Sequence, residues 1–165
     1  MLHDARALAN LVLDYADSRG ISVTPLKLQK LLYFMHGHSW RLRGVGLVFN
    51  SFEAWDHGPV VKVVYDEFKA LGDAEIECRA QWFNFSGGGR ELARVKLAAD
   101  EMRCLSETVE MYGRVDAYTL SRLSHEPCSP WDLVRRTPNK FPKRIIPDHM
   151  IARCFVEGFP GVRRQ

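Results

Sequence analysis

The sequence predicts a mainly α fold, a compact single-domain helical bundle with a small β-hairpin or short sheet. Three observations lead to this class. Apolar residues recur at helical spacing over most of the chain, helix-capping residues stand at the ends of these segments, and strand-like alternation is confined to short stretches. The 165 residues are 46% hydrophobic and 26% charged, which is typical of a globular domain with a buried core. We therefore expect one domain over residues 1–165.

The longest predicted helix is the segment around which we expect the fold to be organised. Thr24 is a favourable N-cap, Pro25 suits the first helical position, and Gly44 ends the helix. One stripe has the spacing of a buried face: Leu28, Leu31, Leu32, Met35 and Leu42. A neighbouring stripe combines apolar bodies with polar tips: Gln29, Tyr33, His36 and Trp40. We expect the first stripe to lie in the core and the second to be available to a partner.

Six further helices are predicted from apolar periodicity and from capping residues. They cover residues 3–19, 59–71, 91–112 and 117–124, and two more begin at Pro130 and Pro147. Asp116 and Ser129 are the expected N-caps of two of them. Between the helices, residues 137–147 are rich in proline and basic residues, so we expect a loop that opens a partly flexible, basic C-terminal end at about residues 137–165.

Residues 45–57 change from helical to strand-like spacing. A turn at Asn50–Ser51 would form a small hairpin, with Phe52 and Ala54 on one face and Trp55 and His57 on the other. The following Pro59 is predicted to be the first residue of the next helix. Residues 72–90 are irregular, with short strand-like runs and a flexible triple-glycine loop at residues 87–89.

Composition points to a cytoplasmic protein. The four cysteines are widely and nearly evenly spaced, which fits neither a disulfide framework nor a CxxC metal site, and we expect reduced thiols. No apolar run approaches the roughly 18 residues of a membrane span, and the first residues lack the basic and apolar regions of a signal peptide. We therefore expect neither a membrane partner nor export.

The charge is uneven along the chain. The net charge is +3 overall, but residues 135–165 hold eight Lys and Arg residues against two acidic ones. A basic end of this kind is usually a solvated surface. It could instead contact an acidic partner or a phosphate backbone, and the second case would make the protein a nucleic-acid-binding regulator.

Signatures of catalysis and cofactor binding are absent. No Walker, GxSxG, HExxH or Rossmann motif is present, so we expect no enzymatic activity and no cofactor. His36 and His38 point about 200° apart on one helix and do not predict a metal site. One enzymatic hypothesis stays open: the prolines around His125 and Cys128 bring these two residues into one turn, where they could act as a catalytic pair.

Several blocks of residues together resemble the Panacea domain, the SocA/GepA-like antitoxin family of bacteria and their prophages. The blocks occur in this order: residues 25–33, Phe52-Glu53-Ala54-Trp55, Gly58-Pro59-Val60-Val61, Val64-Tyr65, Phe68-Lys69, Leu120-Ser121, His125-Glu126 and Pro130-Trp131. The likeness extends from the first helix to about Phe155. It implies a mainly helical fold with a small β element.

The resemblance also implies a function in a toxin–antitoxin system. Members of this family neutralise a toxin encoded beside them, and some act as adaptors that deliver it to a ClpXP-type protease. We therefore expect an antitoxin that binds its cognate toxin directly. Because aromatic side chains dominate the energetics of protein interfaces, we predict that five residues bind the partner: Gln29, Tyr33, Trp40, Trp55 and His57.

Overall fold

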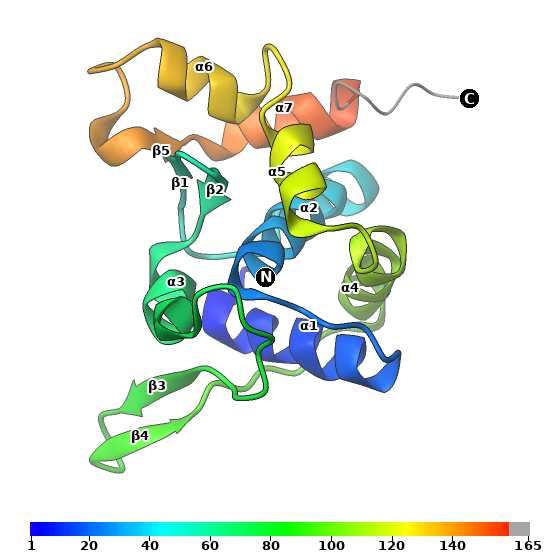
Figure 1. Cartoon of the computed structure of the whole chain (residues 1–165), viewed down its shortest axis with the longest axis vertical. Coiled ribbons are helices and arrows are strands. Elements are labelled where there is room, and N and C mark those ends of the chain that lie inside the picture. Colours follow the sequence, from blue (N-terminus) through cyan, green and yellow to red (C-terminus); the bar gives the residue numbers. More distant parts are fainter. Residues whose placement is uncertain (159–165) are drawn as a thin grey trace.

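The protein is a helical bundle with two small β-sheets, and its computed structural model describes residues 1–158 (Figure 1). The helices are α1 (Ala5–Ser18), α2 (Pro25–Arg43), α3 (Lys62–Phe68), α4 (Ala99–Tyr112), α5 (Ala117–Ser124), α6 (Pro130–Arg136) and α7 (Asp148–Glu157). The strands are β1 (Phe52–Trp55), β2 (Gly58–Val60), β3 (Gln81–Asn84), β4 (Gly89–Leu92) and β5 (Ile145–Ile146), and two 3-10 turns are η1 (Lys69–Leu71) and η2 (Pro142–Arg144). The mainly α fold predicted from the sequence is confirmed.

Helix α2 begins and ends as predicted. The hydroxyl of Thr24 accepts a hydrogen bond from the N–H of Lys27 over 3.4 Å. Gly44 follows the last residue in a left-handed conformation (φ 71°), and its N–H donates to the carbonyl of Trp40. A residue without a Cβ adopts this conformation at little cost, so the C-terminal cap is specified locally.

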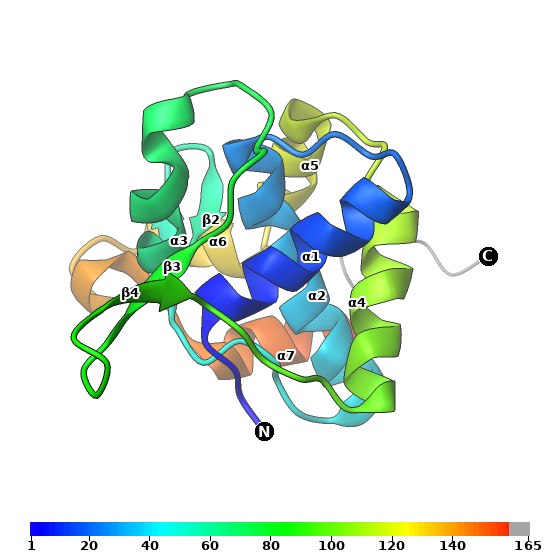
Figure 2. The same ribbon diagram turned by 90° about the horizontal axis from the view of Figure 1, so that it is seen from below.

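Helix α2 forms the centre of the core because α1, α4, α5 and α7 all pack against it (Figures 1 and 2). Residues 28–37 are all buried. The predicted core stripe is confirmed except for Leu42, which is exposed in the last turn. The prediction of an accessible second stripe is wrong for Gln29, Tyr33 and His36, because the surrounding helices cover them as well.

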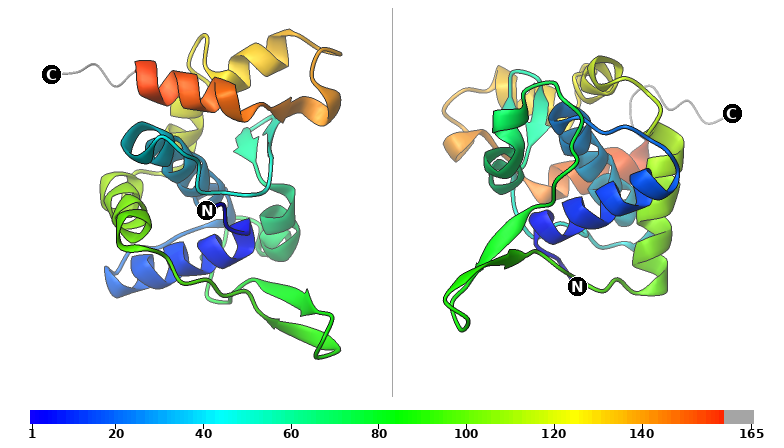
Figure 3. Two further views of the ribbon diagram at one scale, coloured as in Figure 1. Left: turned by 180° about the vertical axis from the view of Figure 1, so that it is seen from behind. Right: turned by 60° about the horizontal axis from the view of Figure 1, so that its bottom comes forward.

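Helix α7 crosses α2 at close range (Figure 3). A Cβ atom at Gly37 would lie 2.4 Å from the ring of Phe155, so glycine is needed at this crossing. The helices are also joined through His36, whose Nε2 lies 2.8 Å from a carboxylate oxygen of Asp148. His36 is therefore a buried structural residue that links two helices.

The first sheet has the strand order β2-β1-β5 and is antiparallel throughout. The predicted alternation is confirmed, since Phe52 and Ala54 are buried. The predicted turn at Asn50–Ser51 is wrong: the chain reverses at Asp56 and His57, between β1 and β2. Pro59 lies in β2 instead of starting a helix. This position suits proline because β2 is an edge strand, where a missing N–H breaks no ladder.

The second sheet contains β3 and β4 alone and projects from the helical body (Figures 1 and 3). Its formation corrects the predicted helix over residues 91–112, since α4 begins only at Ala99. Asn10 of α1 explains why the residues before Ala99 are not helical. Its buried side-chain amide binds the carbonyls of Ala80 and Ala93 and the N–H of Ala80 over 2.7–2.9 Å. These bonds hold both ends of the hairpin against α1.

The remaining helices follow the sequence closely. The carboxylate of Asp116 accepts from the N–H of Thr119 over 2.9 Å, and the hydroxyl of Ser129 accepts from the N–H of Asp132 over 3.2 Å, so both predicted caps are confirmed.

Among residues 1–158, no helix combines the length and the apolar character that crossing a bilayer requires. The same residues contain no group of three or more His, Cys, Asp or Glu side chains placed to hold a metal ion.

Candidate partner-binding site

A groove of about 630 Å³ lies beside the turn that joins β1 to β2. It is enclosed by the start of α2, this turn, α3, the start of α5 and η2. The apolar part of its lining includes Leu26, Ala54, Val60, Val64 and Phe68. We call it the aromatic groove after three other lining residues: Trp55, Tyr65 and Tyr118. Its volume lies in the range of pockets that receive ligands or several side chains of a partner.

The aromatic side chains are accessible and partly pre-positioned. The rings of Trp55 and Tyr65 meet edge to face, with their centroids 4.7 Å apart. The indole N–H of Trp55 also donates to a carboxylate oxygen of Glu53 over 2.7 Å, which fixes the ring orientation. Tyr65 is 39% exposed and Tyr118 is 64% exposed. Rings held in place in this way lose little conformational freedom on binding, which favours an interface.

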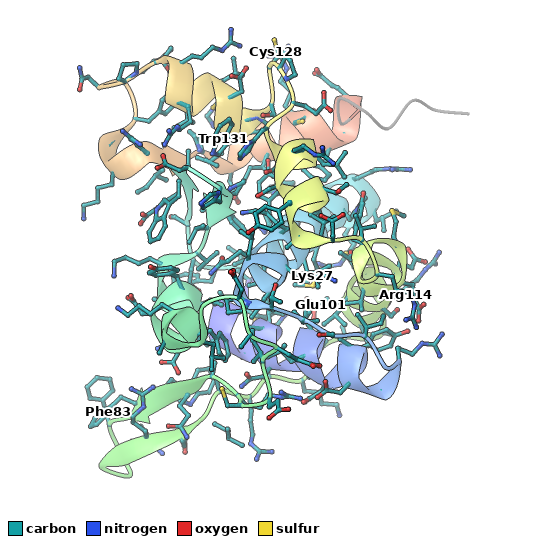
Figure 4. All side chains as sticks on the ribbon, viewed as in Figure 1. Lys27, Phe83, Glu101, Arg114, Cys128 and Trp131 are labelled. Atoms are coloured by element: carbon teal, nitrogen blue, oxygen red, sulfur yellow. The ribbon has the colours of Figure 1, made fainter. Side chains whose placement is uncertain are left out.

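Behind the groove, five side chains bind the backbone of residues 54–61. We call this set the clamp: Gln29 and Lys30 from α2, Ser121 from α5, and Trp131 and Arg135 from α6. Figure 4 shows Trp131 between α6 and the β1–β2 hairpin. Because the clamp comes from three helices, it fixes the turn relative to the whole bundle.

The first half of the hairpin is bound by α5 and α6. The indole N–H of Trp131 donates to the carbonyl of Trp55 over 2.7 Å, and Arg135 donates to the carbonyl of Ala54 over 3.3 Å. The hydroxyl of Ser121 donates to the carbonyl of His57. These bonds tie the carbonyl groups of β1 and of the turn to α5 and α6.

The second half of the hairpin is bound by α2. The side-chain amide of Gln29 accepts from the N–H of Val61 over 2.8 Å and donates to its carbonyl over 3.2 Å. The Nζ of Lys30 donates to the carbonyl of Pro59 over 2.9 Å. Gly58 permits this contact, since a Cβ there would lie 2.8 Å from Nζ and 2.6 Å from the hydroxyl of Ser124.

Lys30 is fully buried, and burial lowers its pKa from 10.5 to about 7. Within the described residues, no carboxylate forms an ion pair with it. Ser124 beside it is also fully buried. A lysine of lowered pKa near a serine resembles a catalytic pair, but neither side chain is open to a substrate in this structure, so we assign Lys30 to the clamp.

His125, in the α5–α6 connection, supports the clamp residue Trp131. Their rings stack with centroids 3.7 Å apart and planes inclined by 10°. Burial, with smaller contributions from Lys30, His57 and Arg135, lowers the pKa of His125. Cys128 is exposed in the same connection, and the guanidinium of Arg136 lies 3.7 Å from its sulfur. The structure therefore uses His125 as a stacking partner of Trp131.

The five predicted partner-binding residues occupy different environments. Trp55 and His57 both line the aromatic groove. Gln29 also borders it, but both ends of its side-chain amide are bonded to Val61. Tyr33 is fully buried among aromatic rings, and burial raises its pKa well above 10, so no partner reaches it in this fold. Trp40 lies elsewhere on α2, with its indole N–H 3.3 Å from His36.

Sequence reasoning missed four residues of the groove. The sequence marked Tyr65 as part of a helical stripe and of a family motif block but not as a partner-binding residue, and its position at the groove depends on the clamped turn beside it. Tyr118, Lys143 and Arg144 also line the groove. Tyr118 comes from the start of α5, whereas Lys143 and Arg144 reach the groove through the pairing of β1 with β5, which joins Phe52 to Ile146. The sequence marked these two only as part of the basic C-terminal end.

Three arginines of the basic C-terminal end form ion pairs in the structure. Arg135 pairs with Asp56, Arg136 with Asp132 and Arg153 with Glu157, over 2.8–3.1 Å. These pairs compensate part of the positive charge that favoured nucleic acid. Two further basic residues of this end, Arg163 and Arg164, lie outside the described residues.

Residues 28–132 match the family described as antitoxin SocA-like, Panacea domain. The chain belongs to this family of SocA-like antitoxins. It is also 38% identical over 135 residues to antitoxin SocA of Caulobacter vibrioides (strain NA1000 / CB15N), an alignment that covers 82% of this chain and 72% of that protein. No solved structure matches the chain significantly. The SocA-like match includes Trp55 and four clamp residues, whereas Arg135, Lys143 and Arg144 lie beyond it.

Proposed function

We propose that this SocA-like antitoxin neutralises a partner toxin by direct protein binding and that the aromatic groove is its toxin-binding surface. The observation that carries the proposal is the clamped turn: five side chains from three helices hold Trp55 and His57 at a groove of partner-binding size. Such a rigid aromatic surface is typical of residues that dominate binding energies. Trp55, His57, Tyr65 and Tyr118 are the proposed contacts.

Neutralisation has two forms that this surface would serve. The bound toxin would be blocked directly, or the antitoxin would act as an adaptor that presents it to a ClpXP-type protease. Family resemblance supports the adaptor form, while the size and rigidity of the groove support binding in either form. A comparison of cells with and without ClpX separates them.

The test is to co-express the chain with the product of the adjacent gene and to measure growth and complex formation. We expect the neighbouring product to be toxic alone, and the chain to restore growth and to co-purify with it. Rescue that persists without ClpX indicates blocking, and rescue that requires ClpX indicates delivery. Rescue without a complex, or a neighbour that is not toxic, would contradict the proposal.

Two tryptophan variants locate the surface. Trp55→Ala removes a groove aromatic and is expected to weaken toxin binding by about 2 kcal/mol, a typical value for a hot-spot residue. Trp82→Ala is the matched control, because Trp82 is also half-buried and its indole N–H also donates to a glutamate, Glu91. Circular dichroism should show folded protein in both cases. Equal binding by the two variants would place the toxin on another face.

A further inference from the structure

The aromatic groove carries two basic residues that the fold leaves without acidic partners. Lys143 and Arg144 line it from η2. In the part of the chain that the structure describes, no carboxylate pairs with either side chain. Both residues also have left-handed backbone conformations, with φ of 52° and 55°. For residues with a Cβ this costs roughly 1–2 kcal/mol each, so the fold sustains a strained segment that presents two unpaired cations.

Among the described residues, Asp56 and Asp73 are the two acidic residues that line the groove. Asp56 in the clamped turn pairs with Arg135 over 2.8 Å. Asp66 on α3 binds Lys62 and Lys69 over 2.6 and 3.1 Å. Asp73, the second acidic lining residue, is exposed and forms no ion pair within the described residues. Lys143 and Arg144 outnumber this one unpaired carboxylate, so the charge that the groove lining leaves unpaired is positive on balance.

Resting on the proposed function, we propose that the groove receives an acidic segment of the protein partner. An aromatic or large aliphatic side chain of this segment enters among Trp55, Tyr65 and Tyr118, and adjacent carboxylates contact Lys143 and Arg144. This assignment gives the groove two recognition elements of different chemistry. The apolar element supplies affinity, while the paired charges supply orientation and discrimination between partners.

A peptide segment fits these observations better than duplex DNA. Nucleic-acid affinity depends on many phosphate contacts over a broad basic surface. Here the unpaired cations are two neighbouring residues at a concave, apolar groove, and Arg135 beside them is already bound to Asp56. A protruding side chain flanked by carboxylates fits this hollow, whereas the phosphates of a duplex would lie outside it.

The position of the two cations in the chain is consistent with a role in selecting partners. Residues 28–132 match the SocA-like family, and they include the aromatic element and most of the clamp. Lys143 and Arg144 lie beyond this match and reach the groove because β5 pairs with β1. The groove thus joins a part of the chain within the family match to a cationic part outside it.

The experiment is a selection of short random peptides displayed on phage against the immobilised full chain, followed by affinity measurements on the selected peptides. We expect the selected sequences to be acidic, with an aromatic or aliphatic residue beside the carboxylates. Lys143→Asn with Arg144→Asn should weaken their binding about ten-fold and flatten its salt dependence. Asparagine tolerates the left-handed conformation, so this variant is expected to fold.

The matched control is Arg94→Asn with Lys96→Asn, which removes two exposed cations at a different hollow and should leave binding unchanged. Neutral or basic selected peptides, failure to select any peptide, or equal loss in both variants would overturn the proposal. Displacement of the peptides by a short DNA duplex with steep salt dependence would also overturn it, in favour of nucleic acid. Toxin rescue by the Lys143→Asn, Arg144→Asn variant, together with neutral selected peptides, would refute the acidic segment while leaving toxin neutralisation intact.

Discussion

The two hairpins of this protein are of similar size but differ in what holds them. The β1–β2 hairpin lies against α2, α5 and α6, and the clamp binds its backbone at residues 54, 55, 57, 59 and 61. The β3–β4 hairpin, which we call the arm (residues 81–92), projects from the body (Figures 1 and 3). At its base Asn10 binds residues 80 and 93, and further along the arm Arg90, opposite Phe83, pairs with Glu67 over 2.7 Å.

The ends of the two hairpins show the same contrast. The turn of the β1–β2 hairpin places Trp55 and His57 at a groove whose backbone is fixed from behind. The tip of the arm carries Phe83 and Phe85, which are 54% and 90% exposed and whose rings meet edge to face with centroids 4.9 Å apart. In Figure 4 Phe83 lies away from the helical body. An isolated two-stranded sheet is marginally stable, so the arm depends on its base whereas the β1–β2 hairpin depends on the bundle.

The largest expected difference between the hairpins comes from glycine. Gly58→Ala adds a Cβ that would lie 2.6–2.9 Å from Ser124 and Lys30, in a backbone with φ of 110°. Overpacking and strain together should lower the free energy of unfolding by about 3 kcal/mol. Gly88→Ala in the arm has φ of 73° but no atom within 4 Å, so only the strain of about 1 kcal/mol remains. Urea denaturation measures both, and equal losses would show that the clamp does not confine Gly58.

The second prediction concerns the charge of Lys30. Its pKa is about 7 in the folded protein and near 10.5 when exposed. Between these values the unfolded chain binds the additional proton, so stability rises with pH from 7 toward 10.5 and does not change below 7. The rise should be on the order of 2 kcal/mol between pH 7 and pH 9, and Lys30→Met should remove it.

A control for Lys30 is Lys96→Met, which changes an exposed lysine and should keep the wild-type pH profile. Denaturation at several pH values compares the three proteins. If Lys30→Met retains the full rise, then the amine is not neutral in the folded state, and the clamp contains a buried charge.

The third prediction tests the base of the arm. Asn10→Ala leaves backbone groups of Ala80 and Ala93 without their side-chain partners and should cost about 2 kcal/mol. Hydrogen exchange should accelerate over residues 81–92 and remain slow over residues 52–60, because the two hairpins have separate attachments. Faster exchange in both hairpins would show that they open as one unit.

The smallest effect is expected at the tip of the arm. Phe85→Ser removes a ring that is 90% exposed, so the stability should change by no more than about 0.5 kcal/mol. Under the proposed function, toxin binding should also be unchanged, in contrast to Trp55→Ala. A loss of binding with Phe85→Ser would move part of the interface from the groove to the arm.

The sequence by itself determined the features that depend on neighbouring residues. The caps at Thr24, Asp116 and Ser129 and the end at Gly44 could be assigned because each interaction spans only a few positions. The alternation of Phe52 and Ala54 identified β1 in the same way. The series of motifs was likewise sufficient to indicate the SocA-like family.

The tertiary structure decided which polar and aromatic residues are accessible. Tyr33 and Gln29 have the helical spacing of an exposed flank, but they are buried because several helices pack around α2. The apolar pattern of one helix does not show how many other helices will surround it. Pro59 lies in a strand because donors from other helices stabilise the β1–β2 turn. Lys143 and Arg144 line the same groove as Trp55 because β5 pairs with β1 across about 90 residues of sequence. Caps are local interactions, whereas a groove requires distant segments to pack together.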